Sequence, residues 1–137
     1  MEVNHTAESG ATASATLETS DIKFEVSSNA GTHNANAYVI TSSPIDISGY
    51  SYLKNTRTIP TRNDYVYEYI GIMPTKTYDS SAPKLEALST QGTDTKIFDI
   101  SSYSGEYYII AGLRITGSGS SGAGTVYSET LTKLWLE

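Results

Sequence analysis

The chain has 137 residues, no cysteine and a formal net charge of -6. That length suits one domain, which can bury a core without disulfides or metal ions. The lack of cysteine excludes a disulfide framework, a thiolate metal site and a cysteine nucleophile, and the acidic balance, with nine scattered Lys and Arg residues, argues against nucleic acid or an anionic membrane as a partner.

The first twenty residues are rich in Ala, Ser, Thr, Gly and Glu and show no hydrophobic period. Such composition predicts a polar N-terminal arm or linker over residues 1–20, followed by one domain over residues 21–137. This start shows neither the basic nor the apolar region of a signal peptide. The longest apolar stretch, YYIIAGL from Tyr107, is too short to cross a bilayer, so we expect no membrane partner.

Alternating apolar and polar residues predict four strands in the first half of the domain. Turn-forming residues separate the first two, and Pro44 interrupts the second, which places it at an edge or a bulge. The four predicted strands are DIKFEV from Asp21, ANAYVITSSPIDI from Ala35, YLKNTRTI from Tyr52 and DYVYEYIGIM from Asp64.

The second half continues the pattern without a sustained helical period. The segment 80–92 is ambiguous, because Leu85 and Leu88 have helical spacing while Pro83 favours an irregular or edge segment. The stretch EYYIIAGLRIT from Glu106 predicts a central strand covered on both faces. The glycine-rich residues 117–124 predict a loop, and residues 125–137 a bent strand or hairpin. We therefore predict an all-β fold, a single antiparallel β-sandwich of jelly-roll type.

A short phrase occurs twice, as IDISGYS from Ile45 and as FDISSYS from Phe98. The alternation places Asp46 and Asp99 on the side opposite their apolar neighbours. Each Asp is then positioned to accept a hydrogen bond from the following Ser-containing turn, in an Asx-type arrangement. We interpret the phrase as a hinge at which the chain enters its next strand.

The search for catalytic or metal-binding sets finds no complete one. GSGSSG from Gly117 is not followed by the helix that a dinucleotide site needs. His5 and His33 lie in polar sequence away from carboxylate clusters, and the acidic residues are dispersed. Glu68 shares a strand face with apolar residues, which is compatible with a glycosidase acid or with a position near the strand end where the side chain pairs with an Arg or reaches water. We expect no enzyme activity, no cofactor and no required metal.

Tyr65, Tyr67 and Tyr69 share one face of the fourth predicted strand. Tyrosine rings on a sheet can stack on the apolar faces of sugars, and Arg114 on the predicted central strand can donate to hydroxyls. These four residues are the candidate ligand-binding site, and sandwich core or a subunit interface explains the tyrosines equally well.

The segments IDISGYSYLK (45–54), FDISSYSGEYYIIAGLRI (98–115) and LTKLWLE (131–137) resemble the galactose-binding-domain-like jelly-roll sandwiches of phage tail-fibre and baseplate proteins and of bacterial surface proteins. The resemblance covers about residues 35–137. It implies a non-catalytic module, often carbohydrate-binding, often part of a multimeric virion component, and sometimes holding a structural calcium ion.

On this basis we expect a structural and recognition module of a virion or surface assembly, such as a tail-fibre, baseplate or head-decoration protein. Its expected partners are further copies of itself, neighbouring virion or surface proteins, and host carbohydrate, and its expected location is the virion or the cell exterior. The alternative is a carbohydrate-binding module of a larger secreted bacterial enzyme or surface protein. A small hydrolase is disfavoured because no catalytic set can be named.

Overall fold

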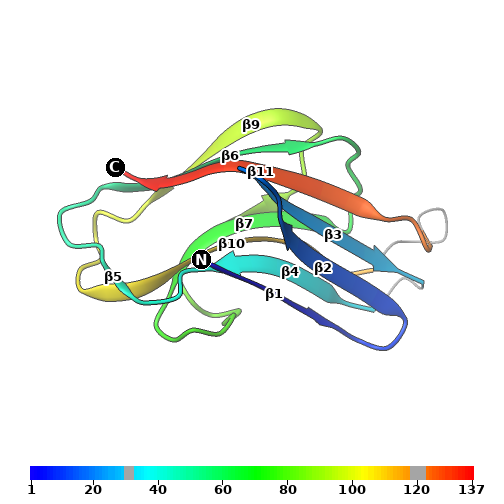
Figure 1. The fold of residues 1–137 in the computed structure, drawn as a ribbon, viewed down its shortest axis with the longest axis horizontal. Coiled ribbons are helices and arrows are strands. Elements are labelled where there is room, and N and C mark those ends of the chain that lie inside the picture. Colours follow the sequence, from blue (N-terminus) through cyan, green and yellow to red (C-terminus); the bar gives the residue numbers. More distant parts are fainter. Residues whose placement is uncertain (30–32, 118–122) are drawn as a thin grey trace.

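The computed structural model, which describes residues 1–29, 33–117 and 123–137, is a sandwich of two antiparallel β-sheets (Figure 1). Sheet 1 has the strand order β1-β4-β10-β7-β8, with the short β5 pairing with β10, and sheet 2 has the order β2-β3-β11-β6-β9. The strands are β1 Glu2–Ala7, β2 Ala11–Leu17, β3 Ile22–Ser28, β4 Ala35–Ile40, β5 Ile45–Asp46, β6 Tyr52–Ile59, β7 Val66–Met73, β8 Lys84–Leu88, β9 Gly92–Asp99, β10 Glu106–Ile115 and β11 Tyr127–Leu136. The predicted all-β jelly-roll sandwich is confirmed.

The described residues contain no helix, and so no helix long and apolar enough to cross a membrane. The ambiguous segment after Pro83 forms the edge strand β8. The chain closes with one strand, β11, whose register against β6 shifts between Leu131 and Lys133. The predicted glycine-rich loop lies mostly outside the described residues, which omit 118–122.

The N-terminal residues belong to the sandwich and do not form the arm that their composition predicts over residues 1–20. Strand β1 pairs with β4 along its whole length, and β2 pairs in the same way with β3. In β2, Ala11, Ala13 and Ala15 turn towards the core while the hydroxyl residues between them face outwards. Alanine is weakly apolar and depleted in strands, so this alternation carries little sequence signal.

The core fills the space between the sheets, and β10 is its central strand as predicted. Five consecutive residues of this strand, from Ile109 to Leu113, are buried, and Arg114 after them is partly exposed. Apolar residues of the other strands of both sheets belong to the same main core cluster. An extensive single core of this kind supports a rigid scaffold, on which surface side chains can be held in fixed positions.

The interior also contains charged groups. Arg57 is fully buried, and its Nε donates to Oε1 of Glu68 at 2.9 Å. Its Nη1 donates to the carbonyl oxygens of Thr90 and Gly92, and its Nη2 to Asp94. Glu68 is 3% exposed and pairs with Arg57 in the interior. Pairing with an Arg was one of the alternatives predicted for this residue.

The repeated phrase forms the expected turn in both places. The amide of Ser48 donates to Oδ1 of Asp46 at 3.0 Å, and that of Ser101 to Oδ1 of Asp99 at 2.9 Å. These bonds lower the pKa of each Asp, with the side-chain hydroxyl of the same Ser as the largest cause. The predicted hinge is confirmed, and the two copies border the same end of the sandwich, where the amide of Ile47 donates to Gly105.

Candidate functional site

The outer face of sheet 1, turned away from sheet 2, carries a row of aligned side chains. Asn36 of β4 lies opposite Arg114 of β10, and Arg114 lies opposite Tyr67 of β7. On the other side of β4, Thr6 of β1 lies opposite Asn36. Directly opposite residues of antiparallel strands share a face. The four side chains therefore form a band across the sheet.

The loop of residues 74–83, between β7 and β8, covers the adjacent part of this face (Figure 1). Tyr78 of the loop packs against Tyr69 and Tyr38, with ring centroids 5.3 and 6.3 Å apart. An ion pair of 2.7 Å between Lys76 and Glu2 ties the loop to β1. The buried residues of this second cluster are Tyr38, Ile40, Tyr69, Met73, Ala82 and Ile110.

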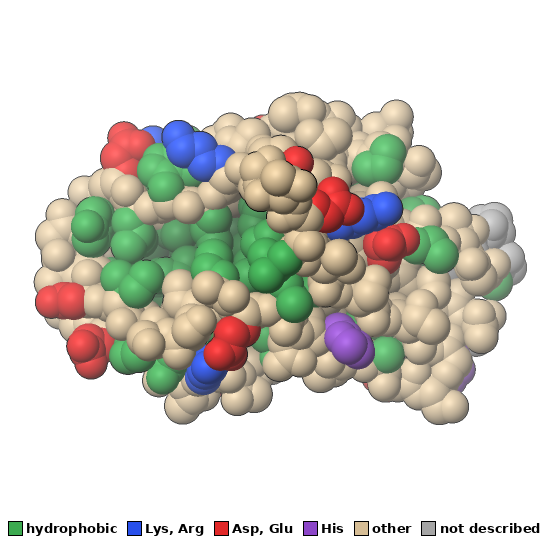
Figure 2. Space-filling view, in the orientation of Figure 1, with side chains coloured by type: hydrophobic (Ala, Val, Ile, Leu, Met, Phe, Trp, Pro, Cys, Tyr) green, Lys and Arg blue, Asp and Glu red, His purple; other side chains and the backbone are tan. Residues whose placement is uncertain are grey.

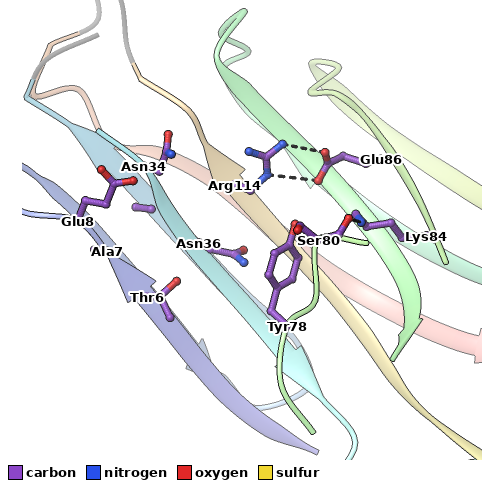
Figure 3. A pocket seen from close by; sticks show the side chains of 11 residues that line it. Thr6, Ala7, Glu8, Asn34, Asn36, Tyr78, Ser80, Lys84, Glu86 and Arg114 are labelled. Carbon is purple, nitrogen blue, oxygen red and sulfur yellow. Dashed lines mark hydrogen bonds and ion pairs between the residues drawn. The ribbon is translucent and has the colours of Figure 1, made fainter. Parts of the chain in front are cut away.

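Beside the covered area the face is hollowed into a pocket of about 470 Å³, here called the polar pocket (Figure 3). This volume is in the range of small-ligand sites. Strands β1, β4, β8 and β10 and the β7–β8 loop all contribute to its lining. The lining residues that matter below are Thr6, Glu8, Asn36, Tyr78, Glu86 and Arg114.

A two-bond ion pair forms one wall of the polar pocket. Arg114 donates from Nη2 to Oε1 of Glu86 at 2.7 Å and from Nε to Oε2 at 3.3 Å. The guanidinium also lies 5.1 Å from the centre of the Tyr67 ring. Partial burial lowers the pKa of Arg114, but the hydrogen bonds to Glu86 and the charge of Glu86 outweigh this effect, so the pKa of Arg114 is raised overall. The pair is a fixed donor and acceptor set, with about one quarter of each side chain exposed.

The opposite part of the pocket is organised by Tyr69. Its hydroxyl donates to Oδ1 of Asn36 at 2.6 Å, which orients the Asn36 side chain towards the pocket (Figure 3). The Tyr69 ring can reach across β10 because position 112 is glycine. A Cβ on Gly112 would lie 2.5 Å from the Tyr69 hydroxyl oxygen. Burial raises the pKa of Tyr69 well above its ordinary value, so the hydroxyl remains a donor.

The structure brings two of the four predicted site residues together. Tyr67 and Arg114 are in contact on the outer face of sheet 1. Tyr69 is on the same face, but it is 2% exposed beneath Tyr78 and has no free ring face for a ligand. Tyr65 precedes β7 in a turn, is 41% exposed, and its carbonyl accepts from the amide of Thr116.

Sequence reasoning missed the other pocket residues, Asn36, Tyr78 and Glu86. Glu86 lies 28 positions from Arg114, and only the pairing of β7 with both β8 and β10 brings them together. Tyr78 stands in a loop without periodicity. A single sequence does not reveal strand register, so none of the three had a usable signal.

The residue considered as a glycosidase acid lies away from the polar pocket, and the described residues contain no metal-binding cluster. Glu68 lies in the interior, bonded to Arg57, and does not line the polar pocket. Within the described ranges no group of three or more His, Asp or Glu side chains could hold a metal ion. In the pocket, both carboxylate oxygens of Glu86 accept hydrogen bonds from Arg114.

A second hollow, of about 270 Å³, opens between the sheets near the two chain ends, where Figure 2 shows apolar side chains gathered. We call it the apolar slot. It is lined by Met1, Thr41, Ile45, Leu53, Ile109, Leu134, Trp135 and Leu136. Its lining contains no charged side chain, and the Thr41 hydroxyl and the Trp135 indole N–H already bond to the amide of Ile109 and to Glu137.

No protein-family model matches the chain, and no curated protein matches it. Solved structures do match. One is a carbohydrate-binding module of the β-sandwich superfamily, with a TM-score of 0.64 and 13% identity over 98% of this chain and 56% of that one. Another is the family 11 carbohydrate-binding module of Clostridium thermocellum in complex with a β-1,3-1,4-mixed-linked tetrasaccharide, with a TM-score of 0.60 and 9% identity over 98% and 87%.

A third match is the enzymatically active domain of bacteriophage CBA120 tailspike protein 4, with a TM-score of 0.57 and 10% identity over 99% of this chain and 19% of that chain. The chain thus spans about half of the first matched structure and a fifth of the tailspike domain. At these identities the matches show a shared fold. The fold is that of β-sandwich carbohydrate-binding modules, in agreement with the jelly-roll resemblance in the sequence.

Proposed function

We propose that the polar pocket binds a neutral glycan and that the protein is a non-catalytic carbohydrate-recognition module. The observation that carries this proposal is the Arg114–Glu86 pair in the pocket wall. A sugar hydroxyl both donates and accepts hydrogen bonds. Neighbouring hydroxyls can therefore bond to the carboxylate and the guanidinium at once, with the charge-assisted geometry already in place.

The charge of the pocket favours a neutral ligand. Glu86 compensates Arg114, and Glu8 balances Lys84, whose Nζ donates to the carbonyl oxygens of Ser80 and Ala82, so the charges of the lining sum to zero. An anionic sugar would meet these carboxylates and would have to displace Glu86 from the guanidinium. Tyr78 adds aromatic surface beside the polar groups of the lining, which suits the apolar face of a sugar ring (Figure 3).

The matched carbohydrate-binding modules support the same function by analogy of fold. The tailspike match and the resemblance in the sequence together support a role in a virion or surface assembly. We propose this assembly role, and it predicts that the protein self-associates. The alternative, a module of a larger secreted enzyme or surface protein, predicts a monomer. Size-exclusion chromatography with light scattering separates them: an oligomer supports the assembly role, and a strict monomer supports the alternative.

The glycan proposal is tested by titrating a panel of neutral glycans, including the β-1,3-1,4-mixed-linked tetrasaccharide, against the protein and two variants. Arg114→Met should weaken binding at least about tenfold, because the guanidinium is lost and Glu86 is left unpaired. Arg62→Met is the matched control, since Arg62 is half-exposed, pairs with Asp64 and does not line the pocket. It should bind like the parent protein.

Two results would contradict the proposal. One is the absence of binding to every glycan of the panel. The other is equal binding by Arg114→Met and the parent protein, with melting temperatures showing that both are folded.

A further inference from the structure

We infer that the polar pocket recognises the end of a glycan chain and excludes its interior, an inference that rests on the proposed glycan binding at this pocket. A site for internal segments needs a groove that is open at both ends. The outer face of sheet 1 would provide one if it were bare, because its register extends rows of side chains across all five strands. Two structural features close that path.

The first feature is the β7–β8 loop. In the row next to the pocket, Gly112 of β10 lies opposite both Tyr38 of β4 and Tyr69 of β7, and Tyr69 lies opposite Glu86 of β8. Tyr78 lies on Tyr38 and Tyr69. An aromatic floor that could continue a sugar-binding groove is therefore covered, and Tyr78 forms a side wall of the pocket (Figure 3).

The second feature is the position of the ion pair. Arg114 is on β10 and Glu86 on β8, and these strands flank β7 on its two sides. The pair therefore crosses β7, and its guanidinium lies over the Tyr67 ring. A glycan chain lying along the band of Thr6, Asn36 and Arg114 would meet this ion pair before it could reach the edge of the sheet at β8.

The loop is anchored at several points, so the wall is part of the folded structure. Ala82 is buried, and the amide of Ile72 donates to the carbonyl of Pro83 at 2.9 Å. Gly71 permits this close return, because a Cβ there would lie 2.8 Å from the same carbonyl oxygen. The Lys76–Glu2 ion pair holds the loop at the opposite edge of the sheet.

The polar pocket extends in the other direction to Thr6 and Glu8 of the β1 edge, both of which are exposed. The terminal sugar would then contact Arg114, Glu86 and Tyr78, and the rest of the glycan would extend across β1. The ligand class is thus a neutral glycan with an accessible terminal residue, and affinity should depend on chain ends and not on chain mass.

The experiment measures binding stoichiometry by calorimetry for three neutral polymers: mixed-linkage β-glucan, xylan and β-1,4-galactan. Each is cut into fractions of graded length. Recognition of one end predicts one bound protein per chain at every length, so chains about tenfold longer bind no more protein per chain.

Bound protein that rises in proportion to chain length would overturn the inference while leaving glycan binding intact. Absence of binding to all three polymers and to their short fractions would overturn the proposed function, and the inference with it. The two failures therefore have different signatures.

Discussion

Glu129 occupies an unfavourable position in the interior, and replacing it should stabilise the protein. Its side chain is 0% exposed on β11, and among the described residues neither carboxyl oxygen has a hydrogen-bond partner. Burial raises the pKa of Glu129 well above its ordinary value, and the nearby Glu68 raises it further, while Arg57 opposes both. Burial therefore favours the neutral, protonated form of the Glu129 carboxyl, which has lost its bonds to water.

The size of the effect follows from the missing bonds. A buried polar group without a partner costs about 1–3 kcal/mol. Glu129→Met keeps the length of the side chain and removes the polar atoms, so the free energy of unfolding should rise by about 1–3 kcal/mol at pH 7. For a chain of this length that corresponds to an increase in melting temperature of about 3–10 °C. Denaturant and thermal unfolding followed by circular dichroism measure both quantities.

The pH dependence provides an independent test. The unfolded chain releases the Glu129 proton near pH 4.5, whereas the folded protein retains it to higher pH. The contribution of Glu129 to the free energy of unfolding is therefore fully present below about pH 4.5. It decreases as the pH rises towards the folded pKa. Burial raises the pKa of Glu68 as well, so Glu129→Met should make the decline shallower without abolishing it.

Glu106→Met on the exposed part of β10 is the matched control, and it should change stability by less than about 0.5 kcal/mol. An unchanged or lower melting temperature for Glu129→Met, with the same pH profile as the parent protein, would show that the Glu129 carboxyl is satisfied in the interior. The reasoning above would then be refuted.

Two further predictions concern the turns and the pocket floor. Asp46→Ala and Asp99→Ala should each lower the melting temperature and leave glycan binding unchanged. Because the folded pKa of each Asp is lowered, the stabilisation by its carboxylate should be present above about pH 3.8 and be lost as the pH falls through the folded pKa. Loss of binding at an unchanged melting temperature would contradict the structural role of either Asp. Tyr69→Phe removes the bond to Asn36 and should cost about 1–2 kcal/mol in chemical denaturation, whereas an unchanged stability would show that this bond is not formed in solution.

The strands that the sequence predicts correctly are those with large apolar residues in alternation. Phe24 and Val26 of β3 and the residues of β7 facing the core mark an inner face without knowledge of their partners. The Asx turns at Asp46 and Asp99 were also predictable, because a side chain bonding two residues ahead is a local interaction. Local patterns therefore sufficed for much of the sandwich.

The remaining features depend on contacts between distant segments. β2 presents alanine to the core, which carries too weak a pattern to separate a strand from a linker. The inward side of β6 contains Asn55 and Arg57 between Leu53 and Ile59, and only its tertiary partners explain the burial of Arg57. The polar pocket likewise depends on strand register, which alternation alone does not specify.

The most direct test of the glycan-binding pocket is a nuclear magnetic resonance titration of isotope-labelled protein with a neutral glycan that the panel identifies, beginning with the mixed-linked tetrasaccharide. Binding at the polar pocket predicts the largest shifts at the Asn36 side-chain amide, the Arg114 Nε–H and the backbone of Glu86. Shifts confined to the apolar slot, to the outer face of sheet 2 around Tyr52 and Trp135, or absent at saturating glycan would contradict the account.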